Sequence, residues 1–186
     1  MVTAGDRGAI VVPPERELRF RAARLRLVIT DVDGVLTDGG VYYSERGEEL
    51  KRFSIRDGMG VERLAAAGIA TGIVTGEQSP SLRRRAEKLG LGDRLRLGVK
   101  DKRLELGRLA ESTHLALDEM AYIGDDVNDL GILELIGAAG LTGAPADAMP
   151  AVARVVHHIT AARGGHGAFR ELAEWILAFR REGGKP

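Results

Sequence analysis

The 186-residue sequence contains no cysteine. A disulfide framework and a thiolate-bound metal site are therefore excluded. It also lacks net charge, since Lys and Arg together number 27 and so do Asp and Glu. This balance argues against a broad surface for nucleic acid or anionic membrane. No apolar run is long enough to span a bilayer, and the N-terminal residues do not form a signal peptide. The sequence predicts a soluble cytoplasmic protein.

The remaining composition is that of a globular protein, with 44% hydrophobic and 29% charged residues. This length suits one domain, which we expect to cover residues 25–182. Residues 1–24 are expected to form a flexible lead-in, because Pro13 and Pro14 interrupt a helix and residues 15–24 are heavily charged.

Short apolar runs alternate with helical patterns along the chain. Runs that suit buried strands lie at 25–29, 69–74, 95–97, 120–123, 138–141 and 152–156. Helical patterns end at Gly68 and Gly90 and cover 100–109, 130–135 and 168–179. This alternation predicts a Rossmann-like α/β fold, a doubly wound parallel sheet with helices on both faces. Residues 39–53 are predicted to form a small β-hairpin flap, and 163–180 a glycine-rich loop and helix.

Polar residues follow four of the predicted strands. Asp31 and Asp33 end the first run, and Gly34 lets the chain turn away. Carboxylates beside a buried strand are costly unless a cation compensates them. Later strands are followed by Thr75, by Lys102, and by Asp125, Asp126 and Asp129. Because parallel strands end at one edge of a sheet, these groups can converge around Mg²⁺ and a phosphoryl group.

The order of these groups resembles the four motifs of haloacid dehalogenase (HAD) superfamily phosphatases. Asp31-Val-Asp33-Gly-Val-Leu-Thr37 matches the first motif, Thr75 the second, Lys102 the third, and Gly124-Asp125-Asp126-x-x-Asp129 the fourth. The resemblance implies that Asp31 attacks phosphorus and that Asp33 is the general acid and base. It implies that Thr75 and Lys102 hold phosphate oxygens.

The same resemblance implies a metal site. Mg²⁺ would be bound by Asp31, Asp125 and the main-chain carbonyl of Asp33, while Asp126 and Asp129 would order waters or Lys102.

A closer resemblance is to the HAD branch that lacks a large cap and dephosphorylates 2-keto-3-deoxy sugar acids. It rests on the hairpin, on Arg56-Asp57-Gly58 and on the tail Arg163-Gly-Gly-His-Gly-Ala-Phe-Arg170. The branch includes 3-deoxy-D-manno-octulosonate 8-phosphate phosphatases and the nonulosonate 9-phosphate phosphatases of sialic-acid-type pathways. It implies a homotetramer in which a neighbour's flap and tail lie near each site. Whether His166 or Arg170 reaches a neighbour's site stays open.

One departure bears on the substrate. Octulosonate phosphatases carry arginine after the Thr-Gly of the second motif, whereas this chain has Glu77. Glu77, with Lys88 eleven residues later, looks like the nonulosonate enzymes. A nonulosonate 9-phosphate is therefore the preferred substrate, and an octulosonate 8-phosphate is the alternative. The expected substrate-binding residues are Asp33, Arg56, Asp57, Gly58, Gly76, Glu77, Arg85 and Lys88.

The sequence disfavours two other classes of protein. A receiver domain carries its phosphoryl-accepting aspartate after the third strand, where this chain has Leu97-Gly98-Val99. A non-catalytic module related to acylneuraminate cytidylyltransferase would not need to retain Asp31, Asp33, Thr75, Lys102 and Asp125. The acidic set therefore favours an enzyme.

Overall fold

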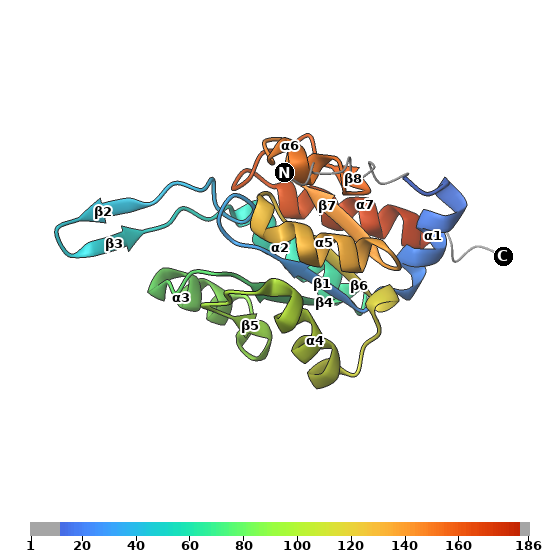
Figure 1. Ribbon diagram of the computed structural model, residues 1–186, viewed down its shortest axis with the longest axis horizontal. Helices are drawn as coiled ribbons and strands as arrows, with labels where there is room; N and C mark the ends of the chain where they lie inside the picture. Colours follow the sequence, from blue (N-terminus) through green and yellow to red (C-terminus); the bar gives the residue numbers. More distant parts are fainter. Residues whose placement is uncertain (1–11, 183–186) are drawn as a thin grey trace, which may run out of the picture.

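The computed structural model describes residues 12–182, and a six-stranded parallel sheet forms its centre (Figure 1). The strand order is β5-β4-β1-β6-β7-β8, with all neighbours parallel. The strands are β1 (Leu27–Thr30), β4 (Ala70–Val74), β5 (Leu95–Arg96), β6 (Met120–Ile123), β7 (Leu141–Ala144) and β8 (His158–Ile159). The predicted Rossmann-like α/β fold is confirmed.

Helices cover both faces of the sheet. They are α1 (Glu15–Arg24), α2 (Ile55–Ala66), α3 (Pro80–Lys88), α4 (Lys102–Thr113), α5 (Leu130–Gly137), α6 (Pro150–Ala153) and α7 (Ala168–Glu182). Three 3₁₀ turns are η1 (Gly92–Arg94), η2 (Leu117–Glu119) and η3 (Val127–Asp129). None of these helices is long and apolar enough to cross a membrane.

Strand β1 shows how the sheet packs against a layer of helices on each face. Val28 packs into the hydrophobic core shared with α1, α2, α3 and α7. Its neighbours Leu27 and Ile29 point the other way, into the core shared with α4, α5 and α6. A central parallel strand is buried on both faces, which is why this stretch is continuously apolar rather than alternating.

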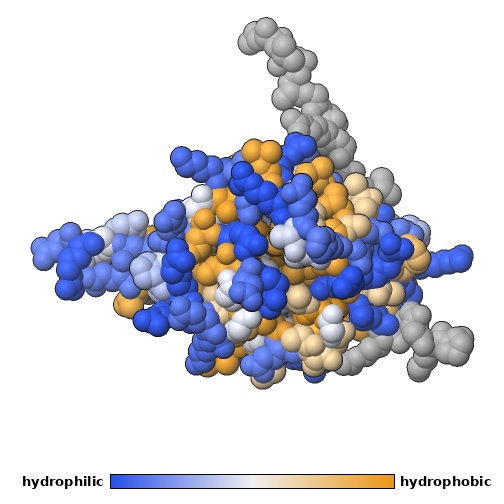
Figure 2. Space-filling model, turned by 90° about the horizontal axis from the view of Figure 1, so that it is seen from below, coloured by the Kyte–Doolittle hydropathy of each residue, from blue (hydrophilic) through white to orange (hydrophobic). Residues whose placement is uncertain are grey.

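The predicted flap is an antiparallel hairpin of β2 (Tyr42–Ser44) and β3 (Gly47–Leu50). It is a separate two-stranded sheet that extends away from the rest of the molecule as a narrow arm (Figures 1 and 2). Its base adjoins the loop after β1, so movement of the flap would shift the turn that carries Asp31 and Asp33.

The N-terminal prediction is partly wrong. Residues 15–24 are not a loose lead-in but helix α1, which packs against α7. Leu18 and Ala22 are buried in this contact, and Arg21 donates hydrogen bonds to the carbonyls of Gly137 and Gly140. Residues 1–11 lie outside the described part of the chain.

Two predicted strands are also misplaced. The run at 138–141 mostly precedes β7, because α5 continues to Gly137. The run at 152–156 is not a strand. Pro150 begins helix α6 there, as its fixed φ and missing N–H suit a first helical turn, and the last strand follows at His158.

Candidate active site

The carboxyl ends of β1, β4 and β6 meet at one edge of the sheet and form an open cleft of about 330 Å³. Asp31 follows β1, Thr75 follows β4, and Asp125 follows β6. The sequence therefore places polar groups at the topological position where open α/β sheets bind ligands. The cleft is lined by Asp31, Asp33, Thr75, Gly76, Glu77, Asp125, Asp126, Val127 and Asn128.

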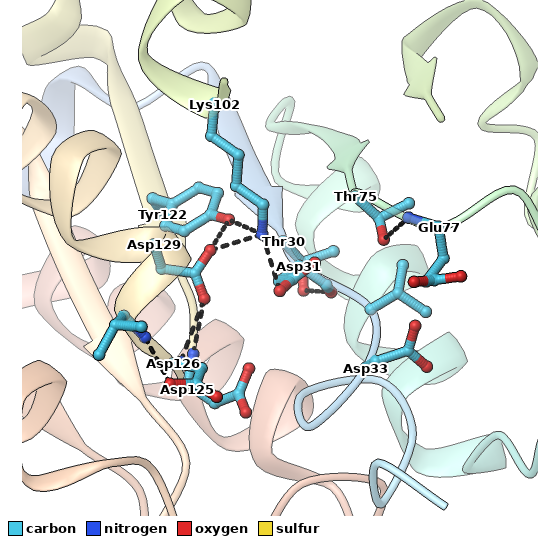
Figure 3. A network of polar contacts seen from close by, with 12 residues as sticks. Thr30, Asp31, Asp33, Thr75, Glu77, Lys102, Tyr122, Asp125, Asp126 and Asp129 are labelled. Carbon is cyan, nitrogen blue, oxygen red and sulfur yellow. Dashed lines mark hydrogen bonds and ion pairs between the residues drawn. The ribbon is translucent and has the colours of Figure 1, made fainter. Parts of the chain in front are cut away.

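A buried ion-pair network lies behind the cleft (Figure 3). The Nζ atom of Lys102, at the start of α4, lies 2.7 Å from Asp31 Oδ2 and 2.6 Å from Asp129 Oδ1. The hydroxyl of Tyr122, on β6, also donates to Asp129 Oδ1, at 2.6 Å. The other oxygen of Asp129 accepts the backbone N–H groups of Asp125 and Asp126. Asp129 thus holds both Lys102 and the loop that carries Asp125.

Two glycines allow the carboxylates to approach this closely. Gly34 has a φ of +84°, and a Cβ there would lie 2.0 Å from Asp125 Oδ2. A Cβ on Gly124 would lie 2.4 Å from Oδ2 of Asp129. Any side chain at either position would therefore push an aspartate out of the site.

The electrostatics of the site indicate negative charge without enough compensation. Burial, with the charge of Asp129 added, raises the pKa of Asp31 to about 6 even though Lys102 opposes the rise. Burial and then the charges of Asp31 and Asp129 raise the pKa of Asp125 to about 7. Burial would lower the pKa of Lys102, but Asp31 and Asp129 outweigh it and raise that pKa.

These residues fit a divalent cation. Asp31, Asp125 and Asp129 each place a carboxylate oxygen within 4.8 Å of the others. Asp125 Oδ1 is buried and has no hydrogen-bond partner among the described residues, so it is an oxygen suited to a ligand role. Both oxygens of Asp129 already accept hydrogen bonds, which leaves Asp31 and Asp125 as the carboxylates best able to bind a metal.

Asp33 also lies in the cleft, but its side chain has different partners. Both of its oxygens accept hydrogen bonds from Lys51 Nζ, at 2.8 and 2.7 Å, and Oδ1 also accepts one from the Thr37 hydroxyl. Lys51 directly follows β3 of the hairpin. The flap therefore touches the acidic turn through an ion pair.

The remaining predicted cleft residues are placed by two loops. Thr75 is buried, and its Oγ1 accepts the backbone N–H of Glu77. Gly76 and Glu77 line the cleft beside it. Asp126 is exposed and accepts the N–H of Val127, capping the turn η3.

The structure divides the predicted substrate-binding set. Asp57, Gly58 and Arg85 line a second, enclosed cavity between α2 and α3 rather than the acidic cleft. Asp57 is buried and accepts the backbone N–H of Arg170 in α7. Burial raises its pKa, opposed by that N–H. Arg56 and Lys88 are exposed and do not line the cleft. Within one chain, only Asp33, Gly76 and Glu77 of the set reach the cleft.

Four residues at the site were not predicted: Val127 and Asn128, which line the cleft, and Tyr122 and Lys51, which bind its carboxylates. Tyr122 belongs to an apolar strand, so its role could have been suspected only from a hydroxyl in a run that is otherwise buried. Lys51 lies in a charged, hairpin-forming segment, and no sequence pattern distinguishes it from a solvated lysine.

Comparison with known proteins identifies close relatives, although no protein-family model matches the chain. Over 157 residues the chain is 40% identical to 3-deoxy-D-manno-octulosonate 8-phosphate phosphatase KdsC of Yersinia pestis, covering 84% of this chain and 82% of that protein. Over 160 residues it is 41% identical to KdsC of Haemophilus influenzae, covering 86% and 87%.

Two similar crystal structures contain metal. One is the 3-deoxy-D-manno-octulosonate 8-phosphate phosphatase of Moraxella catarrhalis in complex with a magnesium ion, a phosphate ion and a KDO molecule. Its TM-score is 0.83 at 35% identity, covering 90% of this chain and 94% of that one. The other is the cobalt-bound H. influenzae phosphatase, with a TM-score of 0.81 at 39% identity, covering 88% and 93%.

Proposed function

Since this chain belongs to the 3-deoxy-D-manno-octulosonate 8-phosphate phosphatase family of the HAD superfamily, we propose that it hydrolyses 3-deoxy-D-manno-octulosonate 8-phosphate. Its cofactor is Mg²⁺. The observation that carries the mechanism is the convergence of Asp31, Asp125 and Lys102 at the carboxyl edge of the sheet. A binding module would not require this buried charge network.

Asp31 is the nucleophile. A carboxylate oxygen of Asp31 forms a bond to phosphorus while the bond from phosphorus to the sugar oxygen breaks, which leaves an aspartyl-phosphate on the chain. Lys102 stays 2.7 Å from Asp31 Oδ2 and orients the carboxylate. Water then attacks the phosphorus, inorganic phosphate leaves and the Asp31 carboxylate is restored.

Asp33 is the general acid and base. It gives a proton to the departing sugar oxygen in the first step and takes one from the attacking water in the second. Its position two residues beyond Asp31 in the same turn, with both side chains lining one cleft, is consistent with this pair of roles.

The metal would be held by the carboxylates of Asp31 and Asp125 and the main-chain carbonyl of Asp33. When bound, it supplies positive charge that reduces the repulsion between Asp31 and an anionic phosphate. Burial, and then neighbouring carboxylate charges, raise the pKa values of Asp31 and Asp125, and a bound cation would offset this cost. Asp129 and Asp126 hold the surrounding loop, and Thr75 with Lys102 binds phosphate oxygens.

The relatives favour the octulosonate alternative over the nonulosonate substrate that the sequence analysis preferred. The relatives from Y. pestis, H. influenzae and Escherichia coli, at 36–41% identity, are octulosonate 8-phosphate phosphatases. Glu77 lies in the cleft and is the feature that argued for a longer sugar acid. A single reversed charge at the rim carries less weight than similarity over most of the chain.

The test is a comparison of kcat/KM for octulosonate 8-phosphate, nonulosonate 9-phosphates and simple sugar phosphates, with Mg²⁺ present. Octulosonate 8-phosphate should be the best substrate, and Glu77→Arg should leave that ranking unchanged. A clear preference for a nonulosonate 9-phosphate in the unaltered chain would contradict the proposal.

The flap supports a further part of the proposal, a homotetramer in which neighbouring chains complete each site. Tyr42, Tyr43 and Leu50 of the hairpin are 61%, 72% and 62% exposed, and apolar surface of this kind is typical of protein interfaces. Light scattering on the purified chain should give the mass of a tetramer. A monomer would contradict this part alone.

A further inference from the structure

Lys51 is the one flap residue with a direct bond to a proposed reacting group. Its side chain is only 1% exposed, and its Nζ lies 2.8 and 2.7 Å from the two carboxylate oxygens of Asp33. A buried ammonium group is costly unless charged partners compensate it. The ion pair between Lys51 and Asp33 is therefore a fixed contact, unlike a solvent-exposed ion pair.

The flap is anchored on the opposite side of the cleft as well. Glu48 of β3 lies 3.7 Å from Lys51 through its Oε2 and accepts a hydrogen bond from the Ser79 hydroxyl through its Oε1, at 2.9 Å. Ser79 precedes α3, in the loop that also carries Glu77. A chain of polar contacts thus runs from this loop through the base of the flap to Asp33.

The contacts leave the two oxygens of Asp33 unequal. Oδ1 accepts from both Lys51 and the Thr37 hydroxyl, whereas Oδ2 accepts from Lys51 alone among the described residues. A carboxylate oxygen has about two acceptor sites. Oδ2 is therefore the oxygen with capacity left for a proton that moves to or from the substrate.

On the basis of the proposed function, we propose that Lys51 is a positioning residue that fixes the Asp33 carboxylate for proton transfer. Asp33 is exposed enough, at 27% of its side chain, to rotate away from its position in the cleft if it is not held. Docking of the flap then sets the geometry of the acid, and an undocked flap leaves Asp33 free to turn away from the leaving oxygen.

The test uses leaving groups of different quality. A sugar alkoxide needs a proton from Asp33, whereas p-nitrophenolate leaves without one. Lys51→Met should lower kcat for octulosonate 8-phosphate roughly 10- to 100-fold, part of the 10²–10⁴ that a general acid contributes. Because Asp33 is also the base for hydrolysis of the aspartyl-phosphate, the two substrates are compared on the first step alone. In a single turnover, release of p-nitrophenolate should change less than about 3-fold, whereas release of octulosonate should slow as much as kcat.

Two further variants make the result specific. Lys51→Arg keeps a donor pair that matches a carboxylate and should restore most of the lost kcat. Arg108→Met removes an exposed charge of α4 that pairs with Glu105, far from the flap in sequence, and should leave both activities unchanged. Equal losses in single-turnover release of the leaving group from both substrates in Lys51→Met, or no loss from octulosonate 8-phosphate, would show a structural or binding role and overturn the inference.

A double-mutant cycle with Asp33→Asn separates this inference from the function beneath it. If Lys51 acts through Asp33, the double variant should be no slower on octulosonate 8-phosphate than Asp33→Asn alone. Additive losses would overturn the inference. If Asp33→Asn itself keeps full turnover of the sugar phosphate, the proposed function of Asp33 fails instead.

Discussion

Asp125→Asn should stabilise the metal-free protein while it removes the enzyme's activity. Within residues 12–182, the side chain of Asp125 makes no hydrogen bond that the substitution would break, and its Oδ1 is buried without a partner. Burial, and then the negative charges of Asp31 and Asp129, raise its pKa to about 7. An amide at this position removes the repulsion but is a poorer ligand for Mg²⁺.

The size of the effect follows from the pKa. Since one pKa unit corresponds to about 1.4 kcal/mol, a rise from 3.8 to about 7 represents about 4 kcal/mol. This penalty combines burial of the charge with repulsion from the neighbouring carboxylates, and water in the open cleft reduces it to about 2 kcal/mol. Because the pKa of Asp125 is higher in the folded protein, its protonated form imposes no penalty on the wild type below about pH 4. The part of the free energy of unfolding that depends on Asp125 then falls as the pH rises to about 7. The gain from the substitution should therefore be largest at pH 8 and less than half as large at pH 5.

Urea unfolding in EDTA, followed by the fluorescence of the single tryptophan, Trp175, measures this gain. Adding Mg²⁺ should stabilise the wild type, because the ion binds the folded state, and should have little effect on Asp125→Asn. Asp93→Asn, which alters an exposed carboxylate in η1, is the matched control. Lower stability of Asp125→Asn in EDTA at pH 8, or equal stabilisation of both proteins by Mg²⁺, would refute the reasoning.

Three other substitutions test the supports of the site. Tyr122→Phe removes the hydroxyl that donates to Asp129, so kcat should fall about 10-fold and stability by about 1–2 kcal/mol; unchanged kinetics would contradict this role. Asp57→Ala removes the acceptor for the Arg170 N–H and should lower the free energy of unfolding in urea by about 1–3 kcal/mol. KM should be unchanged, because Asp57 lines a cavity other than the acidic cleft. Leu18→Ala should cost about 2–3 kcal/mol, whereas a neutral effect would mean that α1 is not part of the core.

The central strands could be predicted because their burial leaves a plain record in the sequence. Strands β1 and β6 are buried along their whole length, and only continuous apolar runs satisfy that environment. The rim residues followed from the same logic, since parallel strands that end together bring Asp31 and Asp125 to one edge.

The misplaced elements have sequence patterns that fit more than one structure, or patterns masked by charged residues. A five-residue apolar run such as 152–156 fits a strand or a buried helical turn equally well, and the helix begins because of Pro150. Helix α1 did carry a signal, because Leu18 and Ala22 are four residues apart and share one helical face. The many charged residues around them favoured the interpretation as a loose lead-in.

The positions of Asp57 and Lys51 could not be predicted from their neighbours in sequence. Asp57 binds the start of α7, more than a hundred residues away, and Lys51 meets Asp33 only because the hairpin folds back on the acidic turn. Both contacts depend on how elements pack, which local patterns do not encode.

The most direct test of the account is the identity of the residue that captures phosphorus. Borohydride reduction during turnover converts an aspartyl-phosphate to homoserine, which mass spectrometry of peptides can locate. The account predicts homoserine at position 31 in the presence of substrate and Mg²⁺, and none in Asp31→Asn. Homoserine at position 33 or 125, or no homoserine while phosphate is being released, would contradict it.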